Sequence, residues 1–565
     1  MKRKTFLKNI AAAVPALWLS SSKAFGGPKF MGSFGGLGFM EPSDGPQSLG
    51  PSGGPSSLDH FTPDWKSLQQ YQTPEWFRNG KLGIWAHWGP QCQPEHGDWY
   101  ARGMYEEGSD TYKFHVAKYG HPSKFGFKDV IHEWKAENWD PERLVSLYKK
   151  AGARYFVAMA NHHDNFDNFN SKYQPWNAVR MGPKKDLIAG WAKAAKRNGL
   201  PFGVSVHASH AWTWYEVAQR ADMTGPMAGV PYDGKLTKEA GKGAWWEGWD
   251  PQALYAQDHV PAQERNMSKM WDWGNGAVPP TKAYIEKFHR RTLQLIDDYG
   301  PDLLYFDDSK LPFWPIDPAG LEIAAYMYNH SMKKHGGKLE AVIEGKILEE
   351  AQRRAMVWDV ERGASNRIEP LPWQTDTCIG NWHYDRRVYD RDGYKSAKTV
   401  IHTLADVVSK NGNLLLNIPV RGDGTIDEKE EKVVEGITAW MDKYSEAIYD
   451  TRPWKVYGEG PAMAGAAELK AQGFNEGKGK PFTGEDMRFT SKGDLLYVIA
   501  LGAPIEGKLR IRSLAAGSEQ FPGQVGQVSL VGRSQPLVFH RDGEALTVEM
   551  PQEMKGEFAY AVKIR

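Results

Sequence analysis

Several common features are missing from this chain of 565 residues, and each absence excludes a class of protein. Only two cysteines occur, Cys92 and Cys378, so no disulfide framework holds the fold together, although a single bridge between them stays open. The net charge is +1, so no overall field favours nucleic acid or an acidic membrane surface as a partner. There is no Gly-x-Gly-x-x-Gly fingerprint after the first predicted strand, no His-Glu-x-x-His motif and no cysteine pair. We therefore expect no cofactor, no metal and no nucleic-acid partner.

The N-terminal apolar stretch, residues 10–19, is too short to span a bilayer, which takes about 20 residues. Basic residues precede it, and the small-x-small sequence Ser22-Lys23-Ala24 follows it, as at a signal-peptide cleavage site. We predict a signal peptide over residues 1–24 and export to the periplasm or the medium, by the general or the twin-arginine route, with no membrane span. Residues 25–57 are rich in Gly, Pro and Ser and predict a flexible linker.

Beyond the linker, segments typical of strands alternate with segments typical of helices. Helices are predicted from Asp140-Pro141 onward and over residues 186–198, 283–298 and 397–408. Apolar strands are predicted over residues 81–88, 155–160, 201–207, 303–306, 339–344, 357–361 and 414–418. This alternation favours a parallel α/β architecture, and over residues 58–455 a (β/α) barrel fits better than an open doubly wound sheet.

The pattern changes after a helix that begins with a capping box, Asp427…Glu430, and runs to about Tyr444. Short alternating strands follow, separated by turn residues. They are predicted over residues 487–490, 495–501, 508–512, 527–531, 545–550 and 558–564. Residues 456–565 are therefore predicted to form an antiparallel β-sandwich.

Asp307 stands out because an apolar strand, residues 303–306, ends abruptly in two carboxylates. In a (β/α) barrel the carboxyl ends of all strands meet at one mouth, where the chemistry is done. Other polar or aromatic side chains also lie at the ends of predicted strands or just beyond them: His87, Asp98, Trp99, His162, His163, His207 and Glu361. Together with 23 tryptophans, they predict a pocket for a polyhydroxylated ring.

Each of these residues also has a structural interpretation, since a strand-end histidine is often a satisfied hydrogen bonder and tryptophans often form core. A metal site at His162-His163-Asp164 is a competing functional interpretation. It is disfavoured because adjacent residues in a regular strand point to opposite faces, so the two imidazoles would not chelate together.

A series of motifs lies in order along residues 60–565. They include residues 76–90, Asp98-Trp99-Tyr100-Ala101-Arg102, residues 161–166, 302–307 and 373–378, Asn411-Gly412-Asn413-Leu414-Leu415-Leu416-Asn417-Ile418, and residues 446–449. In these motifs the chain resembles glycoside hydrolase family 29, the α-L-fucosidases. The resemblance implies a (β/α) barrel with a C-terminal β-sandwich, and hydrolysis of terminal α-L-fucose from a fucosylated glycan with retention of configuration.

Carried over residue by residue, the resemblance places the nucleophile at Asp307, with Asp308 where the family usually has Gly. It places sugar-binding residues at His87, Asp98, Trp99, His162 and His163, and less directly at His207. The family's Trp-Glu-x-Cys acid/base is absent, because Gln374 follows Trp373 here. Glu361 is the better candidate for the acid/base, and Asp376 is the alternative. Two alternative functions stay open. The protein could be a retaining barrel glycosidase that acts on a related sugar such as L-galactose, or a non-catalytic carbohydrate-binding protein on this scaffold.

Overall fold

The computed structural model describes residues 60–255, 273, 278–308, 310–463 and 474–565. The predicted signal peptide and linker lie outside these residues. Among the helices described, none combines the length and apolar character that a bilayer crossing requires.

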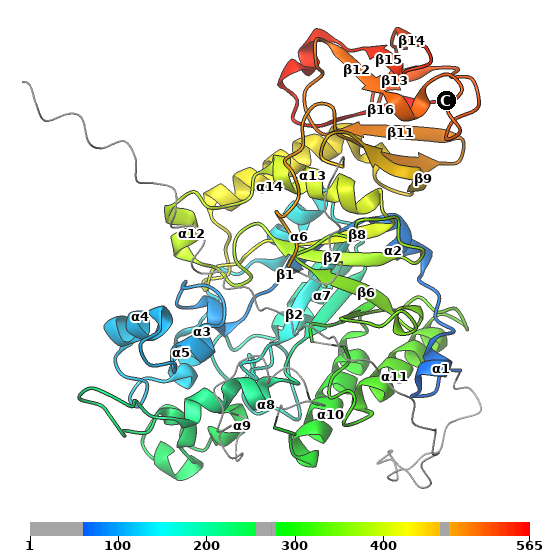
Figure 1. Cartoon of the computed structure of the whole chain (residues 1–565). Helices are drawn as coiled ribbons and strands as arrows, with labels where there is room; N and C mark the ends of the chain where they lie inside the picture. The colour runs from blue at the N-terminus through cyan, green and yellow to red at the C-terminus, as the bar shows by residue number, and fades with distance from the viewer. Residues whose placement is uncertain (1–59, 256–272, 274–277, 309, 464–473) are drawn as a thin grey trace, which may run out of the picture.

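Eight parallel strands close into a barrel in sequence order, each paired with the next and β8 paired with β1. The predicted barrel is therefore confirmed (Figure 1). The strands are β1 (Leu82–Ala86), β2 (Tyr155–Asn161), β3 (Phe202–Val206), β4 (Leu303–Phe306), β5 (Val342–Lys346), β6 (Val357–Glu361), β7 (Trp373–Cys378) and β8 (Gly412–Asn417).

Helices surround the barrel, and two of those predicted from the sequence begin at the expected caps. The Asp140 side chain accepts a hydrogen bond from Arg143 N, with Pro141 in the first turn. The predicted capping box of Asp427 and Glu430 is present. The helices are α1 (Trp65–Leu68), α2 (Glu75–Gly80), α3 (Tyr100–Gly103), α4 (Asp110–Tyr119), α5 (Phe127–Glu133), α6 (Pro141–Lys150), α7 (Leu187–Arg197), α8 (Ala211–Trp214), α9 (Gln252–Tyr255), α10 (Lys282–Tyr299), α11 (Ala319–Lys334), α12 (Arg386–Asp390), α13 (Ala397–Val408) and α14 (Glu428–Tyr444).

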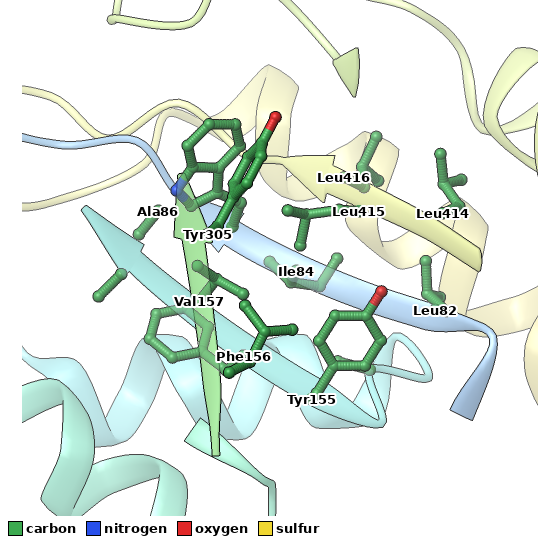
Figure 2. Close-up of a cluster of buried hydrophobic side chains, with 14 of the residues drawn as sticks. Leu82, Ile84, Ala86, Tyr155, Phe156, Val157, Tyr305, Leu414, Leu415 and Leu416 are labelled. Atoms are coloured by element: carbon green, nitrogen blue, oxygen red, sulfur yellow. The ribbon is translucent and has the colours of Figure 1, made fainter. Parts of the chain in front are cut away.

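Apolar side chains fill part of the barrel interior and the layer between strands and helices. Figure 2 shows side chains of β1, β2 and β8 packed together with Tyr305 of β4. Burial of this surface stabilises the fold by about 25 cal/mol per Å² of apolar area removed from water. Cys92 and Cys378 are both buried and are not bridged.

The C-terminal part is a pair of antiparallel sheets, as predicted. Their strand orders are β13-β16-β11-β10-β9 and β12-β15-β14. The first of these strands, β9, crosses the expected domain boundary near residue 455. The strands are β9 (Arg452–Glu459), β10 (Met487–Lys492), β11 (Leu495–Ala500), β12 (Lys508–Ile511), β13 (Val528–Leu530), β14 (Phe539–Arg541), β15 (Leu546–Glu549) and β16 (Tyr560–Ile564).

The sandwich lies against α13 and α14 of the barrel (Figure 1). The Trp440 indole of α14 donates to the carbonyl of Ala559 at 2.9 Å. Arg488 of β10 pairs with Asp406 of α13 at 2.7 Å, and both side chains are largely buried. These contacts hold the sandwich beside the barrel wall.

Candidate active site

Polar residues at alternate positions of β4 to β7 converge inside the barrel, near its C-terminal mouth. Side chains two apart in a strand share a face, so the two members of each such pair project the same way. The residues stack as a deeper layer and an upper layer, as barrel interiors do. The pairs are Tyr305 and Asp307, Glu344 and Lys346, Asp359 and Glu361, and Gln374 and Asp376.

The Lys346 ammonium is the centre of the upper layer. Its Nζ lies 2.5 Å from Asp307 Oδ1, 2.8 Å from Glu361 Oε2 and 3.8 Å from Asp376 Oδ2. One buried cation thus gathers the three carboxyl groups that the sequence singled out. Burial opposes the charge on Lys346, but the surrounding carboxylates, Asp307 first, raise its pKa well above the ordinary value.

Asp307 is held as a carboxylate. Its other oxygen, Oδ2, lies 3.1 Å from Nδ1 of His207. Burial works to raise the pKa of Asp307, but His207 and Lys346 outweigh it and hold the pKa well below the ordinary value. An ionised, oriented carboxylate at the end of β4 is what a nucleophile or an electrostatic stabiliser requires.

Glu361 and Asp376 differ in access to the mouth. They are register partners across β6 and β7. The Glu361 side chain is 23% exposed, whereas that of Asp376 is fully buried. Burial raises the pKa of Asp376 to about 7, against the opposing charge of Lys346. A pKa near 7 is typical of a general acid, but only Glu361 reaches the surface from which a substrate would approach.

The deeper layer is a hydrogen-bonded network beneath this centre. The Tyr305 hydroxyl lies 2.9 Å from both Asp359 Oδ2 and Asp376 Oδ2, and it donates its single proton to one of these two carboxyl groups at a time. Gln374 donates to Glu344 at 2.7 Å and to Asp359 at 3.0 Å. Burial raises the pKa of Glu344 and of Asp359 well above ordinary values, so burial favours the neutral form of both groups. The network fixes the position of Asp376 from below.

Five imidazoles cluster beside the carboxyl centre, at the ends of β1, β2 and β3 and in the loop after β7. Ring centroids lie 5.0 Å apart for His87 and His162, 3.7 Å for His163 and His207, and 4.7 Å for His87 and His383. Trp214 of α8 lies 5.3 Å from His163, so the first helix after β3 contributes to this cluster.

Burial, with neighbouring imidazoles, lowers the pKa of His87, His162 and His163 well below the ordinary value, so these rings are neutral at pH 7. A neutral imidazole carries one donor and one acceptor, which matches a hydroxyl group. Nδ1 of His87, Nε2 of His383 and Nε1 of Trp214 are buried and find no hydrogen-bond partner among the described residues. A buried polar atom without a hydrogen bond lowers the stability of the fold, and a hydroxyl-rich ligand would offset this cost by hydrogen-bonding to these atoms.

Asp98 and Trp99 lie at the edge of the cluster. Asp98 Oδ1 accepts a hydrogen bond from the backbone N of His383 at 2.7 Å and so positions that histidine. Trp99 has a left-handed backbone, with φ of 60°, and its ring lies edge-on to Trp214 at 6.4 Å. The structure thus brings these two predicted residues to the cluster through His383 and Trp214.

The expectation that His162 and His163 point to opposite faces is wrong. Both residues follow the last residue of β2, where strand alternation no longer applies, and their ring centroids lie 4.7 Å apart. Among the residues that the structure describes, two groups present ring nitrogens within 4.8 Å of one another: one of His87, His162 and His383, and one of His162, His163 and His207. These groups have the ligand type that transition metals bind. The absence of a metal stays a prediction.

Comparison with known proteins agrees with this geometry. A family model described as alpha-L-fucosidase matches residues 53–446, and one for the alpha-L-fucosidase C-terminal domain matches residues 480–565. The chain belongs to the alpha-L-fucosidase family. Tissue alpha-L-fucosidase of Bos taurus is 24% identical over 522 residues, covering 89% of this chain and 91% of the relative. Tissue alpha-L-fucosidase of Rattus norvegicus is 26% identical over 411 residues, covering 71% and 75% of the two chains.

Among solved structures, the Thermotoga maritima alpha-fucosidase in complex with fucose superposes with a TM-score of 0.65. It is 25% identical, and the match covers 89% of this chain and all of that one. The family therefore accounts for both the barrel and the C-terminal sheets.

Two residues of the candidate site, Lys346 and His383, were not predicted from the sequence of this member of the alpha-L-fucosidase family. Lys346 fell just beyond a strand predicted to end at Glu344. His383 follows β7, which was not predicted as a strand. Asp308 does not join the Lys346 centre in any contact described: Ser209 donates to its Oδ2, and Nε2 of His210 lies 3.5 Å from its Oδ1.

Proposed function

We propose that this protein hydrolyses terminal α-L-fucosyl linkages with retention of configuration, through a covalent fucosyl-Asp307 intermediate. The supporting observation is the shared ammonium of Lys346. Two carboxylate oxygens that contact one Nζ at 2.5 and 2.8 Å lie no farther apart than the roughly 5–5.5 Å of a retaining pair. An inverting pair needs about 6.5–9.5 Å, to admit a water molecule.

In the first step, Asp307 attacks the anomeric carbon while the bond from that carbon to the leaving oxygen breaks. Glu361, which must carry a proton at this point, donates it to the leaving oxygen. In the second step, Glu361 takes a proton from water, water attacks the anomeric carbon, and the bond to Asp307 breaks. The two inversions give net retention.

Recognition of the sugar is assigned to the neutral imidazoles and to the aromatic rings around them. Fucose carries a methyl group at C6, which is apolar and favours contact with an aromatic face. The rings of Trp85, Trp214 and Trp382 each lie near a histidine of the cluster, at centroid distances of 4.5, 5.3 and 5.9 Å. L-galactose differs by a hydroxyl at C6, which such a surface would leave without a hydrogen-bond partner.

The test is hydrolysis of 4-nitrophenyl α-L-fucoside, with the first-formed anomer followed by proton NMR. We expect α-L-fucose to appear before mutarotation. The α-L-galactoside is the matched control and should react more slowly. A β-anomer as first product would exclude retention, faster galactoside hydrolysis would favour the related-sugar alternative, and binding without turnover would favour a carbohydrate-binding protein.

Lys346→Met should move the acidic limb of the kcat/KM profile to higher pH by about one unit or more. The ammonium helps to hold the pKa of Asp307 low, so its removal lets burial raise that pKa, and the nucleophile becomes protonated at a higher pH. The stability that the depressed pKa contributes is present above the unfolded value of about 3.9 and is lost as pH falls. The variant should therefore lose part of its stability at neutral pH.

Lys443→Met is the control for Lys346→Met, because Lys443 makes an ion pair of 3.0 Å with Glu557 far from the mouth. Its pH profile should match that of the wild type. An unmoved profile with only a lower plateau in Lys346→Met would show that the ammonium does not tune the nucleophile.

We also propose that the enzyme is exported and acts in the periplasm or outside the cell. The support is the order of basic, apolar and small residues over residues 1–24. N-terminal sequencing of protein from the native host should find a chain that begins at or near Phe25. Recovery of uncleaved chain in the cytoplasm alone would contradict export.

A further inference from the structure

A short segment between β9 and β10, residues 474–476, lies against the end of β6 beside the proposed acid/base. We call it the strap. Phe474 donates from its backbone N to the carbonyl of Glu361 at 2.7 Å. Glu476 donates from its backbone N to the carbonyl of Arg362 at 2.9 Å. The strap therefore extends the barrel mouth with backbone from the sandwich side of the chain.

Side chains fasten the strap in place. The Asn475 side chain accepts a hydrogen bond from the backbone N of Ala364 at 2.7 Å and donates one to the carbonyl of Ala364 at 2.9 Å. Glu476 accepts from Thr377 at 2.7 Å, pairs with Arg362 at 3.2 Å and also pairs with Lys395. Burial opposes the charge on Glu476, but Lys395 and its other partners lower the pKa below the ordinary value, so the anchor is ionised. Hydrogen bonds and ion pairs thus fix the strap at the barrel mouth.

Phe474 is the exception within this anchored strap, because its side chain is 61% exposed. Its backbone φ is +52°, a conformation that bulky residues rarely adopt, and Arg362 opposite has a φ of +45°. An exposed aromatic residue on strained backbone, hydrogen-bonded to the backbone of the proposed acid/base, suits a binding element.

The position of Phe474 identifies the part of a substrate it would meet. A general acid protonates the leaving oxygen, so the leaving group lies on the side of Glu361. The ring of Phe474 belongs to the residue that is hydrogen-bonded to the backbone of Glu361. The strap also falls between the two stretches that match the family models, residues 53–446 and 480–565. The strap therefore belongs to neither matched stretch. A residue that sets the preference for one leaving group is expected in such a segment, because that preference differs between members of one family.

We propose that Phe474 forms the wall of a leaving-group subsite, where its ring stacks on the apolar face of the sugar to which fucose is attached. This inference rests on the proposed fucosidase function. Aromatic rings offer a flat apolar surface that matches the C–H face of a pyranose. The ring would strengthen binding of a sugar leaving group and contribute nothing to a leaving group that is a single atom.

The test compares α-L-fucosyl fluoride, whose leaving group is too small to reach Phe474, with three disaccharides. These are α-L-fucosyl-(1→2)-galactose and α-L-fucosyl-(1→3)- and (1→6)-N-acetylglucosamine. For the disaccharide that the wild type cleaves fastest, Phe474→Ala should lower kcat/KM about 10- to 100-fold, mainly through KM. For the fluoride, kcat/KM should change less than about twofold. Phe474→Trp, which keeps an aromatic face, should retain most of the disaccharide activity.

Ile505→Ala is the matched control, because Ile505 is also an exposed apolar side chain of the C-terminal part, 49% exposed. Ile505→Ala should leave kcat/KM unchanged for both the fluoride and the disaccharide. Equal losses on fluoride and disaccharide in Phe474→Ala would overturn the subsite and make Phe474 a support of the catalytic centre. Unchanged disaccharide kinetics would overturn it too. Failure of the wild type on both the fluoride and every disaccharide would instead disprove the fucosidase function, and the subsite with it.

Discussion

Asp307→Ala is expected to lower turnover of an aryl α-L-fucoside by at least about 10³-fold, or about 4 kcal/mol of barrier, while the fold stays intact. Loss of the carboxylate removes the atom that would bond to the anomeric carbon. It also leaves Lys346 without its nearest contact, Asp307 Oδ1 at 2.5 Å. Kinetics together with thermal unfolding separates a chemical loss from an unfolded protein.

A 2-deoxy-2-fluoro-fucosyl fluoride provides the direct measurement. The fluorine at C2 slows both steps, and the good leaving group lets the first step proceed, so the covalent intermediate accumulates. Peptide mass spectrometry should find the label on Asp307. Asp308→Asn is the matched control, because Asp308 is adjacent but engaged by Ser209 and His210, and it should keep most activity. Label on Asp308 or Glu361 would refute the assignment.

The barrel strands could be predicted from the sequence wherever apolar residues dominate. Residues 303–306, which are apolar on both faces, and residues 357–361, where Val357, Trp358 and Val360 are apolar, were predicted with the observed bounds. The remaining barrel strand, β7, was missed because Gln374, Thr375, Asp376 and Thr377 are polar, although all are buried. In this strand hydrogen bonds take the place of apolar packing: Gln374 donates to Glu344, and Thr375 donates to the carbonyl of Val360. A hydrophobicity pattern cannot detect a strand stabilised in this way.

Lys346 was missed for a related reason, yet the sequence carried a signal for it. Glu344 and Lys346 are two residues apart, and so are Asp359 and Glu361. Charged residues repeating with the period of a strand, at the end of an apolar run, indicate side chains that converge inside a barrel. The histidine cluster was predicted residue by residue except for His383. Its closeness to His87 depends on the path of the loop after β7, which local sequence does not determine.

The acid/base can be identified from how strongly the loss of activity in a variant depends on the leaving group of the substrate. Glu361→Ala should reduce activity on fucosyl disaccharides by at least about 10³-fold, but on an activated aryl fucoside far less in the first step, because a good leaving group departs without a proton. With no base for water, the second step also slows, and the intermediate should accumulate. Pre-steady-state kinetics with 2,4-dinitrophenyl α-L-fucoside should therefore show a burst.

Azide should then restore turnover of the activated substrate in Glu361→Ala, since azide needs no deprotonation. It displaces Asp307 from the β-linked intermediate with a second inversion, so the product should be α-L-fucosyl azide. The truncated side chain leaves room for the anion next to the Lys346 ammonium, which lay 2.8 Å from the lost carboxylate. Glu361→Gln is the matched control: it removes the acid but fills the space, so azide should rescue it less.

Asp376→Asn should behave differently from both variants of Glu361. Asp376 is fully buried and hydrogen-bonded by Tyr305, so neither a leaving group nor azide reaches it. It should lose less activity, to a similar degree on good and poor leaving groups, and show no rescue. Because Asp376 lies 3.8 Å from Lys346, its replacement should act through the position of that ammonium. Azide rescue in Asp376→Asn, with none in Glu361→Ala, would instead move the acid/base from β6 to β7.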